Sequence, residues 1–223
     1  MAKNKLKKFD EIKKMPNVLQ PDLKDLEKGF KYKGKWREMF FLNSNPIILE
    51  LGCGKGEYTI GLAKKNTNQN YIGIDIKGAR IYDGALKSVN EKMHNVAFLR
   101  IRIEWIEKCF ALNEINEIWI TFPDPQMKIK RAKKRLTHPI FLRRYHNILK
   151  QNALIHLKTD SSYLFAYTLG VIDGSSHELL NANSNIYDRL LSENEDLNIK
   201  TFYEKKFLSN SSLITYLCFR LNY

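Results

Sequence analysis

Short apolar runs alternate with amphipathic segments from residue 46 onward. The apolar runs are rich in β-branched and aromatic residues, which is typical of buried strands. Strands are expected at 47–51, 71–76, 96–101, 117–122, 153–159 and 213–219. The segments between several of these runs place apolar residues on one helical face. Helices are expected at 57–66, 79–90, 137–149 and 161–171.

This alternation of strands and helices predicts an α/β fold. Consecutive βαβ units build a mainly parallel sheet that helices cover on both faces. Such sheets bind ligands beyond the carboxyl ends of their strands. The loops that follow the first, second and fourth expected strands should therefore meet at one site.

The flanking segments carry weaker patterns. Residues 1–16 are lysine-rich and poor in large apolar side chains, which predicts a mobile basic tail. Residues 17–223 are expected to form a single domain, with the scattered apolar positions of 17–42 docked at its edge. Residues 181–198 are rich in Asn, Ser and Glu and predict an excursion at the surface.

Three glycines, Gly52, Gly54 and Gly56, directly follow the first expected strand. Glycine lets a backbone turn sharply and approach a ligand closely. A dinucleotide-binding loop has the spacing GxGxxG, but its third glycine is replaced here by Glu57, and the chain has no GxxxxGK[ST] phosphate loop. The spacing GxGxG favours a cofactor without a loop-bound phosphate, such as S-adenosylmethionine.

Charged residues flank this loop and the next two strands. Glu50 precedes the glycines and can attract the cationic groups of the cofactor. Asp75 ends the second strand, where an acid commonly binds ribose hydroxyls, although a helix cap would use the same residue. Arg102 and Glu104 follow the third strand. They would contact an adenine or pair with each other at the surface.

Composition indicates a polyanionic partner and a reducing compartment. The formal net charge is +13, and a balance this basic favours nucleic acid. The three cysteines lack CxxC spacing, which argues against disulfides and zinc and fits the cytoplasm. No apolar run is long enough for a membrane span, and no secretory signal is expected.

The positive charge is concentrated beside a second candidate site. Asp124 lies between Pro123 and Pro125, which hold its backbone and therefore its carboxylate in place. Six basic residues follow, here named the basic strip: Lys128, Lys130, Arg131, Lys133, Lys134 and Arg135. We interpret the basic strip as a phosphate-binding surface, with a solvated charged loop as the alternative.

A held acid beside a phosphate-binding surface predicts a nucleobase with N–H donors at its edge. Guanine offers N1–H and N2–H₂, and the lone pair on its N7 can accept a methyl group without prior deprotonation. A fixed carboxylate would orient the base and stabilise the positive charge that develops on it. Asp124 is therefore the candidate catalytic residue.

These residues lie in motifs that resemble the bacterial tRNA (guanine-N7-)-methyltransferase family. The motifs are ELGCGKG (50–56), GID (73–75), FPDP (122–125) with Lys128, KRL (134–136), HLKTD (156–160) and TFYE (201–204). The resemblance implies a class I methyltransferase with a seven-stranded, Rossmann-like sheet. It also implies methyl transfer from S-adenosyl-L-methionine, without a metal, to N7 of the variable-loop guanine at position 46 in tRNA numbering.

The resemblance also implies roles for individual residues. Cofactor contacts are implied at Glu50, Asp75, Arg102 and Asp124, and substrate contacts at Lys128, Asp160, Thr201, Phe202, Tyr203 and Glu204. Spacing alone would make Asp160 a helix N-cap and Tyr203 a core residue. Three positions depart from the family pattern, with Asp75 for Glu, Arg102 for Asp and Gln126 for Trp. At Arg102, a backbone contact or Glu104 would then serve the adenine.

Other functions agree with parts of the sequence. A methyltransferase for ribosomal RNA or a small molecule would not need the basic strip. A non-catalytic RNA-binding protein would lack the cofactor residues, which are present. A dinucleotide oxidoreductase conflicts with Glu57. The sequence is compatible with a monomer and with a homodimer.

Overall fold

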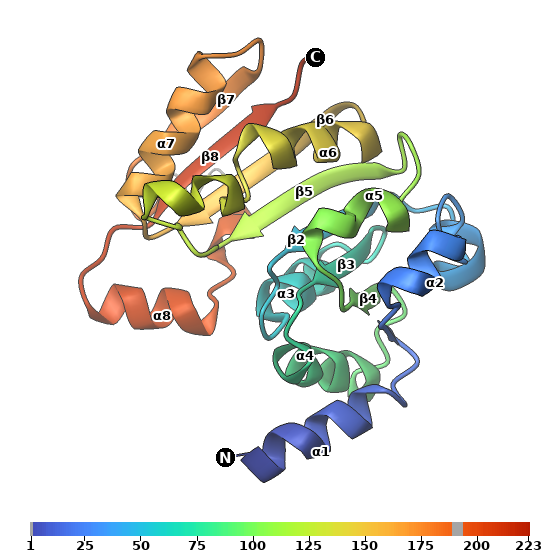
Figure 1. Cartoon of the computed structure of the whole chain (residues 1–223). Helices are drawn as coiled ribbons and strands as arrows, with labels where there is room; N and C mark the ends of the chain where they lie inside the picture. Colours follow the sequence, from blue (N-terminus) through green and yellow to red (C-terminus); the bar gives the residue numbers. More distant parts are fainter. Residues whose placement is uncertain (1, 189–193) are drawn as a thin grey trace.

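The computed structural model describes residues 2–188 and 194–223, which form an eight-stranded sheet with helices on both faces (Figure 1). The sheet order is β1-β4-β3-β2-β5-β6-β8-β7. The strands are β1 (Val18–Leu19), β2 (Ile47–Leu51), β3 (Asn70–Ile74), β4 (Val96–Leu99), β5 (Ile115–Thr121), β6 (Leu149–Thr159), β7 (Glu178–Asn183) and β8 (Thr215–Arg220). Every pair of neighbouring strands is parallel except the two pairs that β8 forms, with β6 and with β7, so the predicted mainly parallel sheet is confirmed.

The sheet has eight strands where seven are expected, because β1 adds a two-residue pairing to the edge strand β4. β7 lies partly in the segment predicted to be an excursion from residue 181, so that prediction is wrong for its first residues. β7 is an edge strand with mostly exposed side chains, and therefore lacks the apolar alternation that marks a half-buried strand. Residues 189–193 of the predicted excursion lie outside the described residues.

Helices on the two faces bury two separate apolar clusters. The helices are α1 (Ala2–Ile12), α2 (Leu23–Lys28), α3 (Glu57–Lys65), α4 (Gly78–Asn90), α5 (Ile106–Cys109), α6 (Pro139–Ile148), α7 (Ser162–Asp173) and α8 (Phe202–Ser209). In β2, Ile47 and Leu49 join the cluster under α6, whereas Ile48 joins the cluster under α3. Side chains alternate along a strand, so Glu50 follows Ile48 to the α3 face.

The amino-terminal segment is helical and packed, whereas the sequence predicts a mobile tail. Helix α1 lies against α4 at the bottom of the view (Figure 1). Ile12 is fully buried, Lys8 pairs with Asp83, and Tyr82 donates to Glu11. Few apolar residues suffice here, because those three or four positions apart share one helical face.

Two helix starts are set by single side chains. His138, not the expected Thr137, caps α6, because the His138 ring accepts a hydrogen bond from the Ile140 N–H at 3.1 Å. Thr137 is buried instead and exchanges a hydrogen bond with Thr168. α7 is capped by Ser161, which accepts from the Leu164 N–H. Asp160, one residue earlier, is therefore free of the capping role that its spacing suggests.

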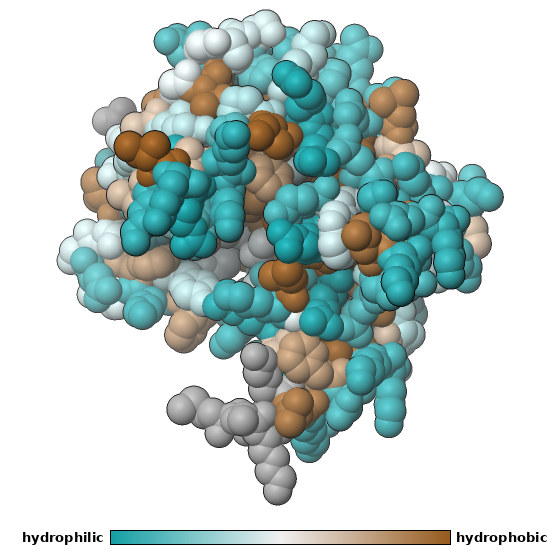
Figure 2. All heavy atoms as spheres, viewed as in Figure 1, coloured by the Kyte–Doolittle hydropathy of each residue, from teal (hydrophilic) through white to brown (hydrophobic). Residues whose placement is uncertain are grey.

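No helix of the described residues combines the length and the apolar character that crossing a membrane requires. On the face seen in Figure 2, apolar side chains form separate small groups between hydrophilic ones. All three cysteines are buried and unbridged.

Candidate functional site

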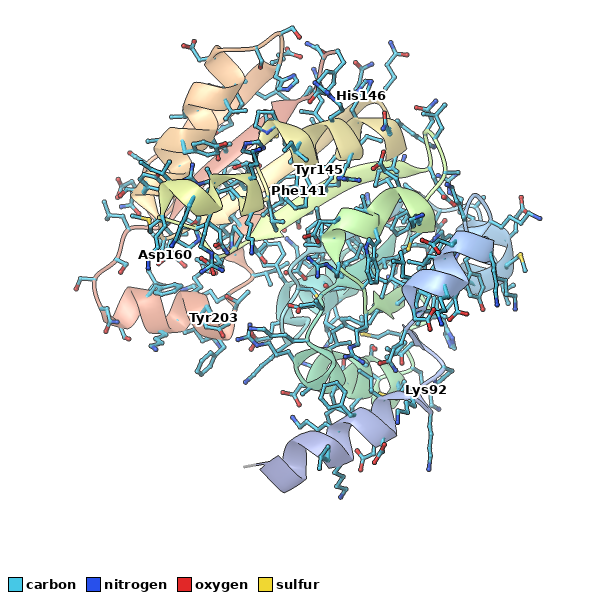
Figure 3. The ribbon with its side chains drawn as sticks, in the orientation of Figure 1. Lys92, Phe141, Tyr145, His146, Asp160 and Tyr203 are labelled. Carbon is cyan, nitrogen blue, oxygen red and sulfur yellow. The ribbon has the colours of Figure 1, made fainter. Side chains whose placement is uncertain are left out.

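The carboxyl ends of the central strands border a cleft of about 340 Å³. It is lined by Glu50, Gly52, Cys53, Gly54, Lys55, Glu57, Lys77, Arg80, Thr121, Phe122, Pro123, Asp124, Pro125, Asp160, Thr201, Tyr203 and Phe207. Figure 3 shows Asp160 and Tyr203 on the side of the molecule where α8 lies, away from His146 at the end of α6. The predicted meeting of the loops after β2, β3 and β5 is confirmed by this lining.

The glycine loop requires glycine at particular positions. Gly52, Gly54 and Gly56 have φ of +78°, +55° and +70°, which side chains disfavour. A Cβ at Gly56 would also lie 2.6 Å from the Phe98 ring. On α4, a Cβ at Gly84 would lie 2.5 Å from the carbonyl oxygen of Lys55. Gly84 therefore lets α4 approach the loop, a role that only the tertiary contact reveals.

Glu50 is buried at the base of the cleft and held by two threonines that the sequence does not single out. Its Oε2 accepts from the Thr59 N–H at 2.8 Å and from the Thr59 hydroxyl, and its Oε1 accepts from the Thr121 hydroxyl at 2.6 Å. Burial raises the pKa of Glu50 from 4.5 to about 7, although these hydrogen bonds lower it. A cationic ligand in the cleft would stabilise the ionised form.

Asp75 supports the glycine loop by a hydrogen bond to its backbone. Its Oδ2 accepts from the Gly54 N–H at 3.0 Å, and its Oδ1 accepts from the Lys77 N–H at 2.7 Å, just before α4 begins. Asp75 and Gly56 are absent from the cleft lining. In this structure Asp75 therefore orders both the loop and the start of the next helix.

Arg102 and Glu104 lie outside the cleft lining. Their side chains form an ion pair of 3.1 Å, and both are substantially exposed. This geometry corresponds to the surface pair, one of the two interpretations of these residues from sequence.

Asp124 is exposed at the cleft and held by its own loop. Its Oδ1 accepts from the Gln126 N–H at 3.0 Å. Phe122 and Gln126 both have φ of +47°, so the backbone turns sharply on each side of the Pro123–Pro125 segment. The second carboxylate oxygen, Oδ2, has no bond to another side chain in the described residues. A substrate group can therefore reach a carboxylate whose position is already set.

The TFYE segment forms the start of α8 and brings aromatic rings to the cleft. Thr201 caps the helix by accepting from the Glu204 N–H at 3.1 Å. Glu57 on α3 accepts from the Phe202 N–H at 2.8 Å and thereby ties α8 to the helix after the glycine loop. Phe202 and Tyr203 are half-exposed, and only Tyr203 lines the cleft. Tyr203 is therefore not the core residue that its spacing suggests.

Glu204 does not face the cleft, although the resemblance implies a substrate contact there. It is fully buried, its Oε2 accepts from Lys158 Nζ at 2.8 Å, and its Oε1 accepts from the Tyr187 hydroxyl at 2.7 Å. Lys158 Nζ also donates to the carbonyl oxygens of Leu197 and Ile199. Lys158 on β6 therefore fastens both α8, through Glu204, and the segment before it, through the two carbonyls.

The six residues of the basic strip lie in two different environments. Residues 129–134 form a short 3₁₀ helix, and Lys128, Lys130, Arg131, Lys133 and Lys134 are exposed outside the cleft lining. Arg135 is instead buried, with 3% of its surface exposed, so the strip presents five cations rather than six.

Charges of both signs line the cleft. The acids are Glu50, Glu57, Asp124 and Asp160, and the bases are Lys55, Lys77 and Arg80. Burial raises the pKa of Asp160. Lys77 and Arg80 lie at the start of α4. The sequence does not single them out, because lysine and arginine are common throughout the chain.

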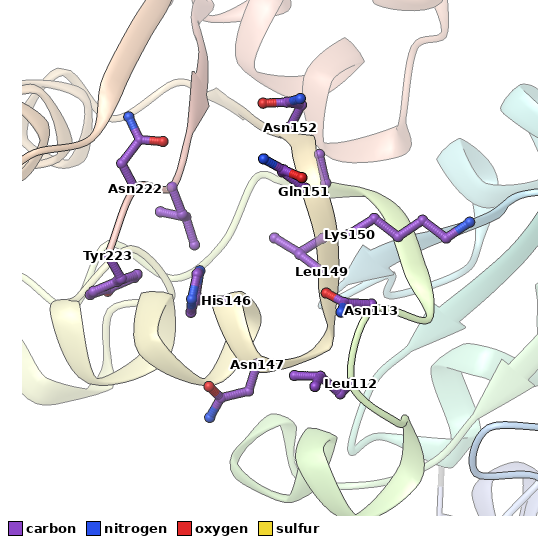
Figure 4. Close-up of a pocket in the computed structure, with 12 residues that line it drawn as sticks. Leu112, Asn113, His146, Asn147, Leu149, Lys150, Gln151, Asn152, Asn222 and Tyr223 are labelled. Carbon is purple, nitrogen blue, oxygen red and sulfur yellow. The ribbon is translucent and has the colours of Figure 1, made fainter.

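A second cleft, of about 480 Å³, lies at the opposite ends of the strands, where β6 begins (Figure 4). Figure 4 shows several amide side chains around it, including Asn113, Asn152 and Asn222, together with His146 and Tyr223. Its lining has no Asp or Glu side chain. The cleft at the glycine loop is therefore the better site for a cationic cofactor.

The glycine-loop cleft fits S-adenosylmethionine. Gly52 and Gly54 line the cleft and, without side chains, leave room for a ligand beside the loop. The buried carboxylate of Glu50 suits the cationic groups of the cofactor. Among the residues described, no group of three or more His, Cys, Asp or Glu side chains is arranged to hold a metal ion.

Comparison with known proteins identifies the family. Residues 44–217 match a family model described as "Putative methyltransferase". The tRNA (guanine-N(7)-)-methyltransferase of Christiangramia forsetii is 54% identical over 221 residues, 99% of both chains. The corresponding protein of Bacteroides thetaiotaomicron is 45% identical over 99% of this chain and 87% of its own.

The fold has close counterparts among solved structures. The 16S rRNA methyltransferase KamB superposes with a TM-score of 0.65 over 85% of this chain and 94% of its own, at 12% identity. A likeness at this identity concerns the fold alone. Sequence identity over nearly the full length decides the family: this chain belongs to the tRNA (guanine-N(7)-)-methyltransferases.

Proposed function

We propose that this protein transfers a methyl group from S-adenosyl-L-methionine to N7 of a guanine in tRNA. The observation that carries the proposal is the Asp124 carboxylate, which is held at one oxygen by Gln126 and exposed at the cleft of the glycine loop. The five exposed cations of the basic strip follow Asp124 in the chain. Family membership at 54% identity over 99% of the chain supports the same activity.

Some residues of the cleft would bind the cofactor, and others would bind the substrate. S-adenosylmethionine, when bound, supplies an activated methyl group on a cationic sulfur. Glu50 and the glycine loop would hold its charged end, and Asp75 keeps the loop in shape. Asp124 would accept N–H donors from the guanine edge and stabilise the positive charge that methylation creates on the base. Asp160 and Tyr203 line the same cleft and would position the base.

The resemblance of the motifs supports a more specific proposal for the substrate. We propose the variable-loop guanine at position 46 in tRNA numbering as the acceptor. Lys128 and the other exposed cations of the basic strip would contact tRNA phosphates. A tRNA substrate, together with buried and unbridged cysteines, fits a cytoplasmic location.

The decisive experiment incubates the protein with labelled S-adenosylmethionine and unmodified tRNA, followed by nucleoside analysis. We expect label in 7-methylguanosine, and a transcript with adenine in place of the variable-loop guanine should take up none. Label in another nucleoside would refute the guanine-N7 assignment. Label in ribosomal RNA or a small molecule alone would favour a different acceptor.

Cofactor affinity should depend on pH through Glu50. Since the pKa of Glu50 is raised to about 7, the free protein keeps this proton at lower pH, and a cationic ligand must displace it. Affinity should therefore rise with pH and fall by about tenfold for each unit below pH 7. Calorimetry at pH 5.5–7.5 in buffers of different ionisation enthalpy would measure the released proton. In Glu50→Gln the affinity should be weaker and flat with pH; a slope as steep as that of the wild type would show that another group titrates.

The exposed cations should determine the salt dependence of tRNA binding. Each phosphate contact contributes about 0.7–0.9 to the slope of log affinity against log salt. Lys133→Gln with Lys134→Gln should therefore reduce the slope by roughly 1.4–1.8 if both contact phosphates. The matched control is Lys13→Gln with Lys14→Gln, which neutralises two exposed lysines just beyond α1. An equal reduction in the control would contradict a localised phosphate surface.

A further inference from the structure

Arg135 lies in a cage of aromatic rings rather than at the surface. Its guanidinium carbon is 4.9 Å from the ring centre of Tyr163 and 4.3 Å from that of Tyr167, both on α7. Its Nη2 donates to the Tyr163 hydroxyl at 2.7 Å. A guanidinium enclosed in this way cannot reach a phosphate without leaving its partners, so Arg135 has a different task from the exposed members of the basic strip.

The remaining bonds of Arg135 lead to the active-site loop. Its Nε and Nη2 both donate to the carbonyl oxygen of Gln126, at 3.3 and 3.1 Å. The N–H of the same residue donates to Asp124 Oδ1 at 3.0 Å. Gln126 has φ of +47°, a conformation that costs energy for a residue with a side chain and needs support from its surroundings. Arg135 gives that support through the carbonyl of the strained residue.

We propose that Arg135 is a positioning residue that holds the Asp124 carboxylate in place through Gln126. The proposal rests on the proposed function, because it assigns Asp124 to the reaction. Arg135 anchors the loop to α7, and the anchored loop presents the carboxylate at the cleft. The effect is expected on turnover, since a displacement of about 1 Å at a reacting group can lower a rate by roughly a hundredfold.

The geometry requires arginine at this position. The guanidinium plane lies against two rings while two of its nitrogens share one carbonyl oxygen and one of them also reaches a hydroxyl. Lysine has a single nitrogen on a flexible stem and cannot reproduce this fork. Arg135→Lys therefore keeps the charge and removes only the geometry, which makes it the informative variant.

The test compares Arg135→Lys with Arg143→Lys, the same change at an exposed arginine on α6. For Arg135→Lys we expect kcat to fall about 10- to 100-fold. KM for tRNA, cofactor affinity and the salt slope should change little, and hydrogen exchange at the Gln126 amide should be faster. Arg143→Lys should match the wild type. Tyr163→Phe, which removes one hydrogen bond and keeps the ring, should shift kcat and exchange in the same direction by less.

Each alternative has its own result. A salt slope reduced by about one with kcat unchanged would overturn the proposal and make Arg135 a phosphate contact. Unchanged kcat with unchanged Gln126 exchange would also overturn it. If the wild-type protein methylates no tRNA, the proposed function fails; the exchange at Gln126 then still decides whether Arg135 holds the loop.

Discussion

Replacing Lys158 by methionine is expected to lower the free energy of unfolding by about 3–5 kcal/mol, the usual cost of breaking a buried ion pair from one side. Both Lys158 and Glu204 have fully buried side chains, and the distance between Lys158 Nζ and Glu204 Oε2 is 2.8 Å. The variant would leave the Glu204 carboxylate buried beside Tyr187 alone. It would also leave the carbonyls of Leu197 and Ile199 without this donor.

Denaturant unfolding with two companion variants identifies the cause. Adding Glu204→Gln to Lys158→Met removes the uncompensated charge and should recover a large part of the loss. Lys205→Met changes the same residue type at an exposed position of α8 and should stay within about 0.5 kcal/mol of the wild type. If the double variant is no more stable than Lys158→Met, the unpaired Glu204 charge is not the source of the instability.

Replacing Asp124 by asparagine is expected to reduce kcat by roughly 10²–10³, the range for losing a preorganised electrostatic contact. Asparagine keeps the size of the side chain and an oxygen for the Gln126 N–H. It loses the negative charge that would stabilise the methylated guanine. The measurement is single-turnover methyl transfer to tRNA with saturating cofactor, which separates the chemical step from binding.

Two controls separate this effect from misfolding. Unfolding stability of Asp124→Asn should stay close to that of the wild type, because Asp124 is exposed. Asp173→Asn, at the exposed end of α7, should retain full turnover. Full turnover and full affinity in Asp124→Asn would show that Asp124 has no role in the reaction. Asp160, which lines the same cleft, would then be the next candidate.

Local sequence patterns predict the centre of the sheet well. β2, the glycine loop and α3 follow from a continuous apolar run, glycines at alternate positions and an amphipathic segment, all within twenty residues. The edges of the fold are predicted poorly. β7 is exposed at the sheet edge and has no apolar alternation. α1 has few large apolar residues, so its packing against α4 is not expected from its own sequence.

Roles within shared motifs cannot be read from residue type alone. Lys134 and Arg135 are neighbours in one basic run, yet Lys134 is exposed and Arg135 is enclosed by Tyr163 and Tyr167. Tyr203 and Glu204 are neighbours in one motif, yet only Tyr203 lines the cleft. The side chains that decide these roles come from α7 and β6, far away in the sequence.

The sequence by itself determined the α/β fold, the glycine loop and the candidate acid Asp124, because these depend on hydrophobic periodicity and on backbone constraints within a few residues. Only the tertiary structure decided which charges face the cleft and which are buried in pairs. A charged side chain stabilises the fold when elements distant in the sequence bury it and supply its partners. That condition is met at Arg135 and at the Lys158–Glu204 pair, and it is set by packing rather than by local sequence.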